Sequence, residues 1–247
     1  WRMKPRQILR HPVGEILAAQ YPQGYWMHRD LGISPRYRAT VWQILFLAQL
    51  GDGSAGAAAL RSRAGRVERA IAIVLQDNRA PCGALRLRQD HPSLALTGAV
   101  VWAVGRLGAA DVDDWRPTWA WITQEVAAGR VDGVAAVWLA RAAHVWRRWD
   151  WLASYQPWQW AGWPSPSEAR LIFPLTLCPD LLSTMEMACE VGRADLIPNE
   201  ALAWLRARRL PDGRWPLDCI PGPLWCDVGE IGVANPWITA RARAVLA

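Results

Sequence analysis

Apolar residues recur along this chain with helical spacing, and two kinds of helix alternate. Residues 40–48 (TVWQILFLA) are apolar on nearly every side, which predicts a helix that is buried all round and ends at Gly51. Residues 67–75 place their apolar positions three and four apart, with charged residues on the other side, which predicts a two-faced helix. No stretch alternates apolar and polar residues for long enough to make a strand, so we expect an all-α fold.

The same alternation returns further along the chain. Residues 97–104 and 115–122 form a second predicted pair, and residues 180–191 and 199–205 form a third. Each pair is predicted to end in a glycine turn, at Gly83, Gly133 and Gly213. Repetition of this length is typical of stacked helical hairpins, which bury their apolar faces only against their neighbours. Such hairpins can build an open solenoid, or a closed ring with the apolar helices inside.

We expect a single domain over residues 1–247. Residues 1–20 are expected to contribute a partial outer helix, and residues 150–174 an irregular connection rich in Trp and Pro. Hydrophobic residues make up 52% of the chain and charged residues 20%, which excludes a disordered chain. The chain opens at Trp1 without a leader pattern, so we expect a fragment of a longer chain that carries no signal peptide.

Charge and cysteine content narrow the choice of partners. The net charge is +6, but Lys4 is the only lysine among 28 basic residues, which favours a GC-rich codon bias over a basic surface. We therefore expect no nucleic-acid partner. The five cysteines are odd in number and have no CxxC spacing, so we predict free thiols in a reducing cytoplasm. No apolar run approaches the ~18 residues of a membrane-spanning helix.

Two turns carry a sequence motif. Residues 20–26 (QYPQGYW) fit Gln-x(3)-Gly-x-Trp, and residues 209–215 end in the same way with Arg209 in place of Gln. These turns resemble the QW repeats of the squalene–hopene cyclase and protein prenyltransferase superfamily. Three longer segments are similar to bacterial cyclase-like repeat proteins of unassigned activity: residues 34–43, residues 173–175 with 180–182, and residues 236–242.

The resemblance covers about residues 20–247 and implies an α/α toroid of helical hairpins, incomplete or with one irregular repeat. In that family the glutamine caps a helix terminus and stacks on the Trp of the adjacent turn. The implied function is that of an isoprenoid- or terpenoid-processing protein that binds an apolar ligand in a central cavity. The alternative is a non-catalytic toroid that binds a lipid or a protein, and the sequence leaves enzymatic activity open.

Class II terpenoid cyclases protonate an alkene with the middle Asp of an Asp-x-Asp-Asp box. Residues 111–114 (DVDD) match this box, but they precede the two-faced helix at 115–122, so we interpret them as the first turn of an outer helix. The catalytic box is the alternative. The position most similar to the cyclase box is residues 177–180, where only the last Asp is present. Asp180 is therefore our candidate catalytic residue, with a helix N-cap as its alternative role.

Protein prenyltransferases hold zinc with Asp, Cys and His. Asp218–Cys219 and Cys226–Asp227 lie close together in this chain, but no Asp-x-Cys motif occurs. The diphosphate–magnesium motifs of class I synthases are absent as well. We therefore expect no metal site and no cofactor.

In a closed ring, the starts of the inner helices would gather around one mouth. The polar and aromatic residues expected there are Arg36, Tyr37, His91, Asp132, Asp180 and Trp237. The apolar walls are expected from Trp42, Trp102 and Trp138. This set suits a long apolar ligand with one polar end, such as an isoprenoid, while core packing is the alternative role of each Trp.

Residues 146–163 are the densest aromatic stretch, with Trp146 at one end and Trp163 at the other. One interpretation is a peripheral membrane contact, because Trp suits the membrane–water boundary. Packing between repeats is the alternative. We expect a cytoplasmic protein, with a place at the surface of the inner membrane if the first interpretation holds.

Overall fold

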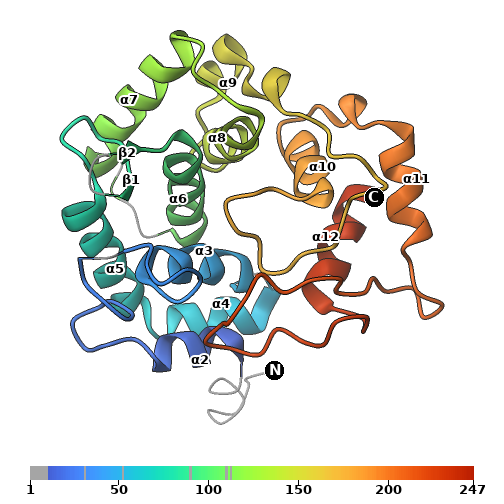
Figure 1. Cartoon of the computed structure of the whole chain (residues 1–247), viewed down its shortest axis with the longest axis horizontal. Helices are drawn as coiled ribbons and strands as arrows, with labels where there is room; N and C mark the ends of the chain where they lie inside the picture. Colours follow the sequence, from blue (N-terminus) through green and yellow to red (C-terminus); the bar gives the residue numbers. More distant parts are fainter. Residues whose placement is uncertain (1–10, 31, 52, 89–90, 109–110, 112) are drawn as a thin grey trace. The chain divides into compact units, whose positions relative to one another are not determined.

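The computed structural model describes residues 11–247 except 31, 52, 89–90, 109–110 and 112 (Figure 1). Helices make up most of the regular structure. The strands named among the described residues are β1 (Arg86–Arg88) and β2 (His91–Pro92), an antiparallel pair with a register irregularity. The predicted all-α class is therefore confirmed. The chain forms two compact units, described separately below.

Unit 1 comprises the described part of Trp1–Arg130 together with Gly222–Asp227. Besides the two strands, its elements are α2 (Pro12–Ala18), α3 (Thr40–Leu50), α4 (Gly53–Arg61), α5 (Ala64–Ile73), the π-helical turn η1 (Val74–Asn78), α6 (Leu94–Leu107), the 3₁₀ turn η2 (Asp113–Trp115) and α7 (Arg116–Ala127).

Unit 2 comprises Val131–Pro221 and Val228–Ala247. Its elements are α8 (Gly133–Val145), α9 (Trp149–Tyr155), η3 (Pro157–Trp160), α10 (Leu181–Glu190), η4 (Ala194–Leu196), α11 (Asn199–Ala207) and α12 (Pro236–Leu246).

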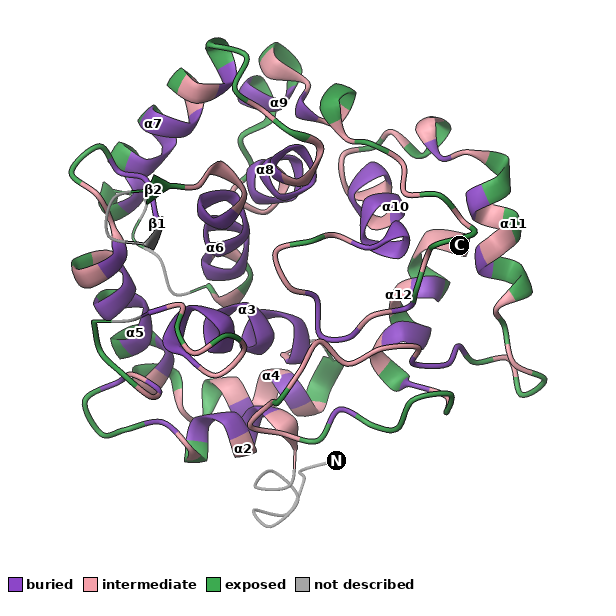
Figure 2. Cartoon of the chain, viewed as in Figure 1, coloured by how far each residue is buried: buried purple, intermediate pink, exposed green. Residues whose placement is uncertain are grey.

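The two predicted kinds of helix are present. Every residue of α3 is buried, and α6 and α8 are buried over long continuous stretches (Figure 2). Within unit 1, α3 and α6 pack side by side. By contrast, α5, α7 and α11 bury one side and expose the other, as their charged residues predict. Burial on all sides explains why α3 and α6 carry almost no charge.

Side-chain caps fix where α6, α8, α10 and α12 begin. In each case the capping oxygen accepts a hydrogen bond from the amide three residues further on, which satisfies a donor that the helix leaves open. These caps are Ser93 for α6 (3.2 Å), Asp132 for α8 (2.7 Å), Asp180 for α10 (2.7 Å) and Asn235 for α12 (3.1 Å).

One turn geometry occurs three times, at Gly24 and Gly83 in unit 1 and at Gly213 in unit 2. Each glycine has a positive φ and donates its amide to the carbonyl three residues earlier. Two residues after each glycine, a backbone amide donates to a threonine hydroxyl of the following helix. These pairs are Trp26–Thr40 (3.2 Å), Leu85–Thr97 (2.9 Å) and Trp215–Thr239 (3.0 Å). The predicted internal repeat is therefore visible as a repeated hydrogen-bond pattern.

The first and last of these turns share a further set of contacts. Gln20 donates to the Gly24 carbonyl (2.8 Å) and the Arg66 carbonyl (3.0 Å). Arg209 donates to the Gly213 carbonyl (3.2 Å) and lies over the Trp215 ring. Arg209 thus occupies the place of the glutamine and makes the equivalent bond.

The predicted turn at Gly133 is wrong. Gly133 is the first residue of α8, because Asp132 caps the helix there, and the turn after α7 instead lies at Gly129, where φ is 71°. The place of Gly133 after a predicted two-faced helix suggested a turn that the chain makes four residues earlier, at Gly129.

We expect Gly83→Ala to destabilise the protein by about 2–5 kcal/mol, because the added carbon would meet the Pro117 carbonyl oxygen at 2.4 Å and φ is +97°. Gly108→Ala is the matched control. Its φ is also positive but nothing lies within 4 Å, so we expect a cost of about 1–2 kcal/mol. Urea unfolding measures both, and equal losses would contradict the close contact at Gly83.

Candidate functional site

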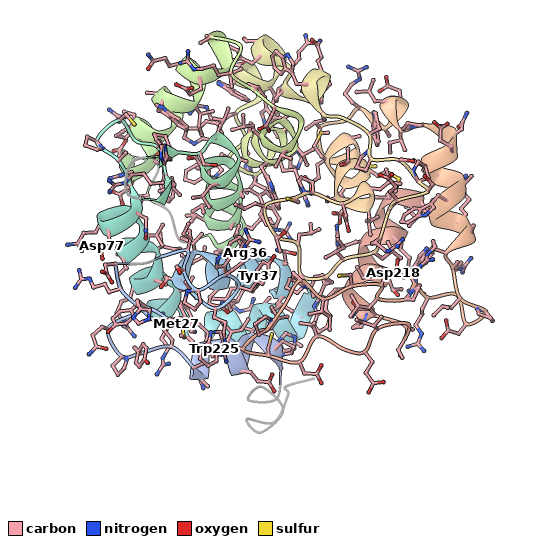
Figure 3. The ribbon with its side chains drawn as sticks, in the orientation of Figure 1. Met27, Arg36, Tyr37, Asp77, Asp218 and Trp225 are labelled. Carbon is pink, nitrogen blue, oxygen red and sulfur yellow. The ribbon has the colours of Figure 1, made fainter. Side chains whose placement is uncertain are left out.

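An aromatic pair in unit 1 lies where the chain enters α3. The Tyr37 ring meets the Trp42 ring edge-on at 5.2 Å between centroids, and the Arg36 guanidinium lies 5.8 Å from the Tyr37 centroid (Figure 3). Tyr37 has a left-handed backbone (φ 66°), and its carbonyl accepts a hydrogen bond from Gln43 Nε2 at 2.9 Å. Trp42 donates from Nε1 to the Ile33 carbonyl at 2.8 Å. The structure thus brings together three residues of the predicted set.

These three residues differ in what a ligand could reach. Arg36 is exposed and Tyr37 is half-buried, whereas Trp42 is only 5% exposed. Trp42 therefore supports Tyr37 from within the core.

The other predicted residues of unit 1 lie on other elements. His91 is exposed on the short strand β2. Trp102 lies in the middle of α6 and is 2% exposed, so it acts in core packing.

Asp180 in unit 2 is buried at the start of α10, and both of its carboxylate oxygens have partners. Oδ1 accepts a hydrogen bond from the Ser183 amide at 2.7 Å, and Oδ2 accepts one from the Ile172 amide at 3.2 Å. Arg241 Nη2 lies 3.5 Å from Oδ1. The Asp180 carboxylate is therefore fixed by its neighbours within unit 2.

Asp180 belongs to a larger buried network of charges that joins α8, α10 and α12. Arg241 makes a two-pronged contact with Glu186 (2.9 and 2.8 Å). Arg141 makes the same contact with Glu190 (2.9 and 2.8 Å) and also approaches Glu186. Burial alone would lower the pKa of Arg241, but the charges of Glu186 and Asp180 raise it overall. Arg241 therefore stays charged, and the network connects three helices of unit 2.

The remaining predicted residues of unit 2 have distinct surroundings. Asp132 is exposed and caps α8. Trp138 is fully buried and donates to the Leu177 carbonyl at 2.9 Å. Trp237 is half-buried and stacks on Phe173, with centroids 5.1 Å apart and planes 8° from parallel.

The acidic box at residues 111–114 lies on the surface where it is described. Val112 is outside the described residues. Asp113 and Asp114 open η2, which leads into α7, and both are exposed, as is Asp111. Asp111 accepts a hydrogen bond from the Asp113 amide, and Asp113 forms an ion pair with Arg116. This placement agrees with our interpretation of the box as a helix start.

The cysteine-containing segments have other partners. Asp218 pairs with Arg208 and accepts a hydrogen bond from the Leu171 amide at 2.8 Å (Figure 3). Burial raises the pKa of the Cys226 thiol to about 12, with contributions from Glu15 and Asp227. Among the described residues, no three His, Cys, Asp or Glu side chains form a group that could hold a metal ion.

The aromatic stretch at 146–163 divides between core and surface. Trp158 packs against Val137, Ala140 and Met187, whereas Trp149 is 51% and Trp160 is 40% exposed. Over the part of the chain that the structure covers, no helix has both the length and the apolar character needed to span a membrane.

No protein-family model and no curated protein matches the chain. A solved structure does: the type II terpene cyclase MstE from Scytonema, in complex with its product merosterolic acid A. The TM-score is 0.52 at 16% sequence identity, over 98% of this chain and 78% of that one. The fold is similar to that of a type II terpene cyclase. This confirms the predicted terpenoid cyclase-like fold, while the closed ring and its central cavity stay predictions.

Sequence reasoning missed two residues that contact the predicted site. Trp225 Nε1 donates to the Arg38 carbonyl at 3.0 Å, and Gly222 packs against the Tyr37 ring. Trp225 and Arg38 lie 187 positions apart, so no local pattern could relate them. The chain contains 18 Trp residues, so the sequence alone does not distinguish Trp225 from the others.

Proposed function

We propose that this protein binds an apolar, isoprenoid-like ligand and does not start a cyclisation by protonation from Asp180. The likeness in fold to a type II terpene cyclase that was solved with its product supports an apolar ligand. Two partly exposed aromatic surfaces, one in each unit, are the candidate contacts.

Exposure separates the aromatic residues that a ligand could touch from those that pack the core. Trp42, Trp102 and Trp138 are at most 5% exposed. Tyr37 and Trp237 are half-buried, and each rests on a second aromatic ring. A ring held by a neighbour presents a rigid apolar face, which suits an isoprenoid chain and loses little entropy on binding.

The bonding of Asp180 is the observation that carries the second half of the proposal. Protonation of an alkene needs an acid that holds a proton and points it at the substrate. Both carboxylate oxygens of Asp180 accept backbone amide hydrogen bonds, and Oδ1 also faces Arg241, so both oxygens are engaged within the protein and neither is directed at a ligand. Asp111, Asp113 and Asp114 are exposed on the surface and lie in no enclosed apolar site.

Binding can be measured by the quenching of Trp fluorescence during titration with squalene or geranylgeraniol. We expect Tyr37→Ala and Trp237→Ala each to weaken saturable binding about tenfold, which corresponds to ~1.4 kcal/mol of lost apolar contact. Tyr21→Ala is the matched control because Tyr21 is exposed and outside the predicted set. Absence of saturable binding, or equal losses in all three variants, would contradict the proposal.

Catalysis is tested separately. The purified protein is incubated with squalene or with geranylgeranyl diphosphate, with and without magnesium, and products are analysed by mass spectrometry. We expect no cyclised product. A product that disappears in Asp180→Asn, with circular dichroism unchanged, would show that Asp180 does donate a proton.

We also propose that the exposed tryptophans near α8 give the protein a weak affinity for membranes. Trp149 follows the C-terminal end of α8, and the Trp160 carbonyl lies near Gly133 at its start, so these two exposed residues lie near opposite ends of the helix. Arg147 and Arg148 are exposed beside Trp149, which favours an anionic lipid surface.

Liposome flotation tests this contact. With vesicles of phosphatidylglycerol and phosphatidylcholine, we expect a bound fraction that falls at least threefold in the double variant Trp149→Ala, Trp160→Ala. Trp158→Ala is the comparison, because Trp158 packs against the core. Failure of the unmodified protein to float would end the membrane proposal and leave ligand binding unaffected.

A further inference from the structure

A short segment near the C-terminus lies on unit 1 although the chain on both sides of it belongs to unit 2. This segment, Gly222–Asp227, is called the strap below. It has no regular secondary structure, and it is attached to unit 1 at its beginning, middle and end. The first two attachments involve Tyr37 of the aromatic pair and Arg38 beside it, and the third involves Glu15 of α2.

The strap begins against the Tyr37 ring. A Cβ atom placed on Gly222 would come within 2.6 Å of Tyr37 Cδ2 and 2.9 Å of Cε2. A residue with a side chain would therefore push the ring away, since real atoms do not approach this closely. The absence of a side chain at position 222 allows the strap to cover part of the Tyr37 ring.

Trp225 fastens the middle of the strap. Its Nε1 donates to the Arg38 carbonyl at 3.0 Å, and the Arg38 guanidinium lies 4.1 Å from the centre of its ring. A cation stacked on a Trp ring is attracted by the ring's electron-rich face. Arg38 follows Tyr37 directly, so Trp225 holds the backbone next to the proposed ligand contact.

The end of the strap is held by a hydrogen bond from its backbone to a side chain of α2. The Asp227 amide donates to Glu15 Oε2 of α2 at 3.1 Å. Cys226 lies between this bond and Trp225, and burial raises the pKa of its thiol to about 12. Because the thiolate is the reactive form, a closed strap leaves Cys226 nearly inert at pH 8, and an open strap returns it to ordinary reactivity.

We propose that the strap is a latch over the ligand-contacting face of Tyr37, fastened by Trp225, and that it opens without unfolding of the rest of unit 1. The inference rests on the proposed function for its ligand. A short segment without regular secondary structure, fastened to unit 1 mainly through the Trp225 side chain, has the low local stability that is typical of elements that open on their own. Opening uncovers the Tyr37 ring, while Gln43 keeps the Tyr37 backbone in place from the buried side.

The rate of Cys226 labelling reports on the latch directly. The protein is treated with N-ethylmaleimide at pH 8, and labelled peptides are quantified by mass spectrometry. We expect Trp225→Ala to label Cys226 at least ten times faster than the unmodified protein. Trp149→Ala, which removes an exposed Trp elsewhere, should leave the rate unchanged. The exposed Cys82 and Cys178 serve as internal standards for reagent access.

Hydrogen exchange separates opening from general loosening. In Trp225→Ala we expect the amides of α3 to keep their protection. An unchanged Cys226 rate in Trp225→Ala would overturn the latch, and so would a loss of α3 protection that accompanies faster labelling. Gly222→Ala provides a second variant, in which displacement of the Tyr37 ring should also speed Cys226 labelling.

Stopped-flow mixing with squalene completes the test. We expect squalene to associate several-fold faster with Trp225→Ala, because binding no longer requires the strap to open first. If squalene binds but labelling does not change, the latch is wrong and the proposed function stands. If squalene does not bind, the proposed function and the ligand's part in the latch fail together, while labelling still decides whether the strap opens.

Discussion

Replacement of Arg241 by methionine is expected to lower the free energy of unfolding of unit 2 by about 3–5 kcal/mol. The guanidinium makes a two-pronged contact with Glu186, lies 3.5 Å from Asp180 and donates to the Ile172 carbonyl. Methionine keeps much of the packing volume but leaves two buried carboxylates without this cation. An uncompensated buried charge costs far more than a missing surface ion pair.

Arg243→Met is the matched control because it makes the same chemical change on the same helix at an exposed position. We expect it to change stability by less than about 0.5 kcal/mol. Urea unfolding followed by circular dichroism measures both variants. A similar unfolding midpoint for the two variants would show that the network contributes nothing to stability.

The pH dependence of this difference follows from the raised pKa of Arg241. A raised pKa in the folded state means that the arginine's contribution to stability is fully present below its ordinary pKa and is lost only as the pH rises through the still higher pKa of the folded state. The difference between Arg241→Met and the unmodified protein should therefore be the same at pH 7 and pH 9. A marked change in this stability difference between pH 7 and pH 9 would show that a group other than Arg241 causes it.

Much of the fold could be predicted because its signals are local. Residues 40–48 are apolar on nearly every side, which predicts a helix that is buried all round. The structure agrees, because α3 is buried along its whole length. Asp180 as a helix N-cap is similarly local, because the cap bond joins residues three apart. Gly133 shows the limit of such signals, since glycine permits a turn but does not require one.

The site depends on contacts that no local pattern contains. Arg141 lies within an apolar helix, which indicates a buried partner, yet Glu190 is 49 positions away and Arg241 reaches Glu186 across 55 positions. The network can be identified only once it is known how α8, α10 and α12 pack against one another, and the sequence does not give this packing. The position of Tyr37 just before a buried helix predicts its place at the site, but its left-handed backbone and its cover by the strap involve contacts with Gln43 and Gly222.

Trp26→Ala and Trp215→Ala are each expected to cost about 3–5 kcal/mol, as truncation of a buried aromatic residue does. Both rings are almost fully buried. Trp26 donates to the Ile16 carbonyl at 2.8 Å and Trp215 to the Leu205 carbonyl at 2.7 Å, and each carbonyl is third from the end of its helix. The last carbonyls of a helix lack partners within it, so truncation both opens a cavity and leaves an acceptor unsatisfied.

The equivalence of the two turns makes this prediction sharp. Trp26 and Trp215 belong to different units, yet they make the same bonds, so similar losses are expected from both. Trp26→Leu and Trp215→Leu should cost less than the alanine variants, because Leu85 occupies the corresponding position in the turn at Gly83 and is fully buried there. Trp149→Ala controls for loss of an exposed indole. If urea unfolding shows that Trp215→Ala costs no more stability than Trp149→Ala, the repeated turn does not hold the hairpins together. The bond from Trp215 to the end of α11 is equivalent to the bond from Trp26 to the end of α2, so both bonds should stabilise the protein.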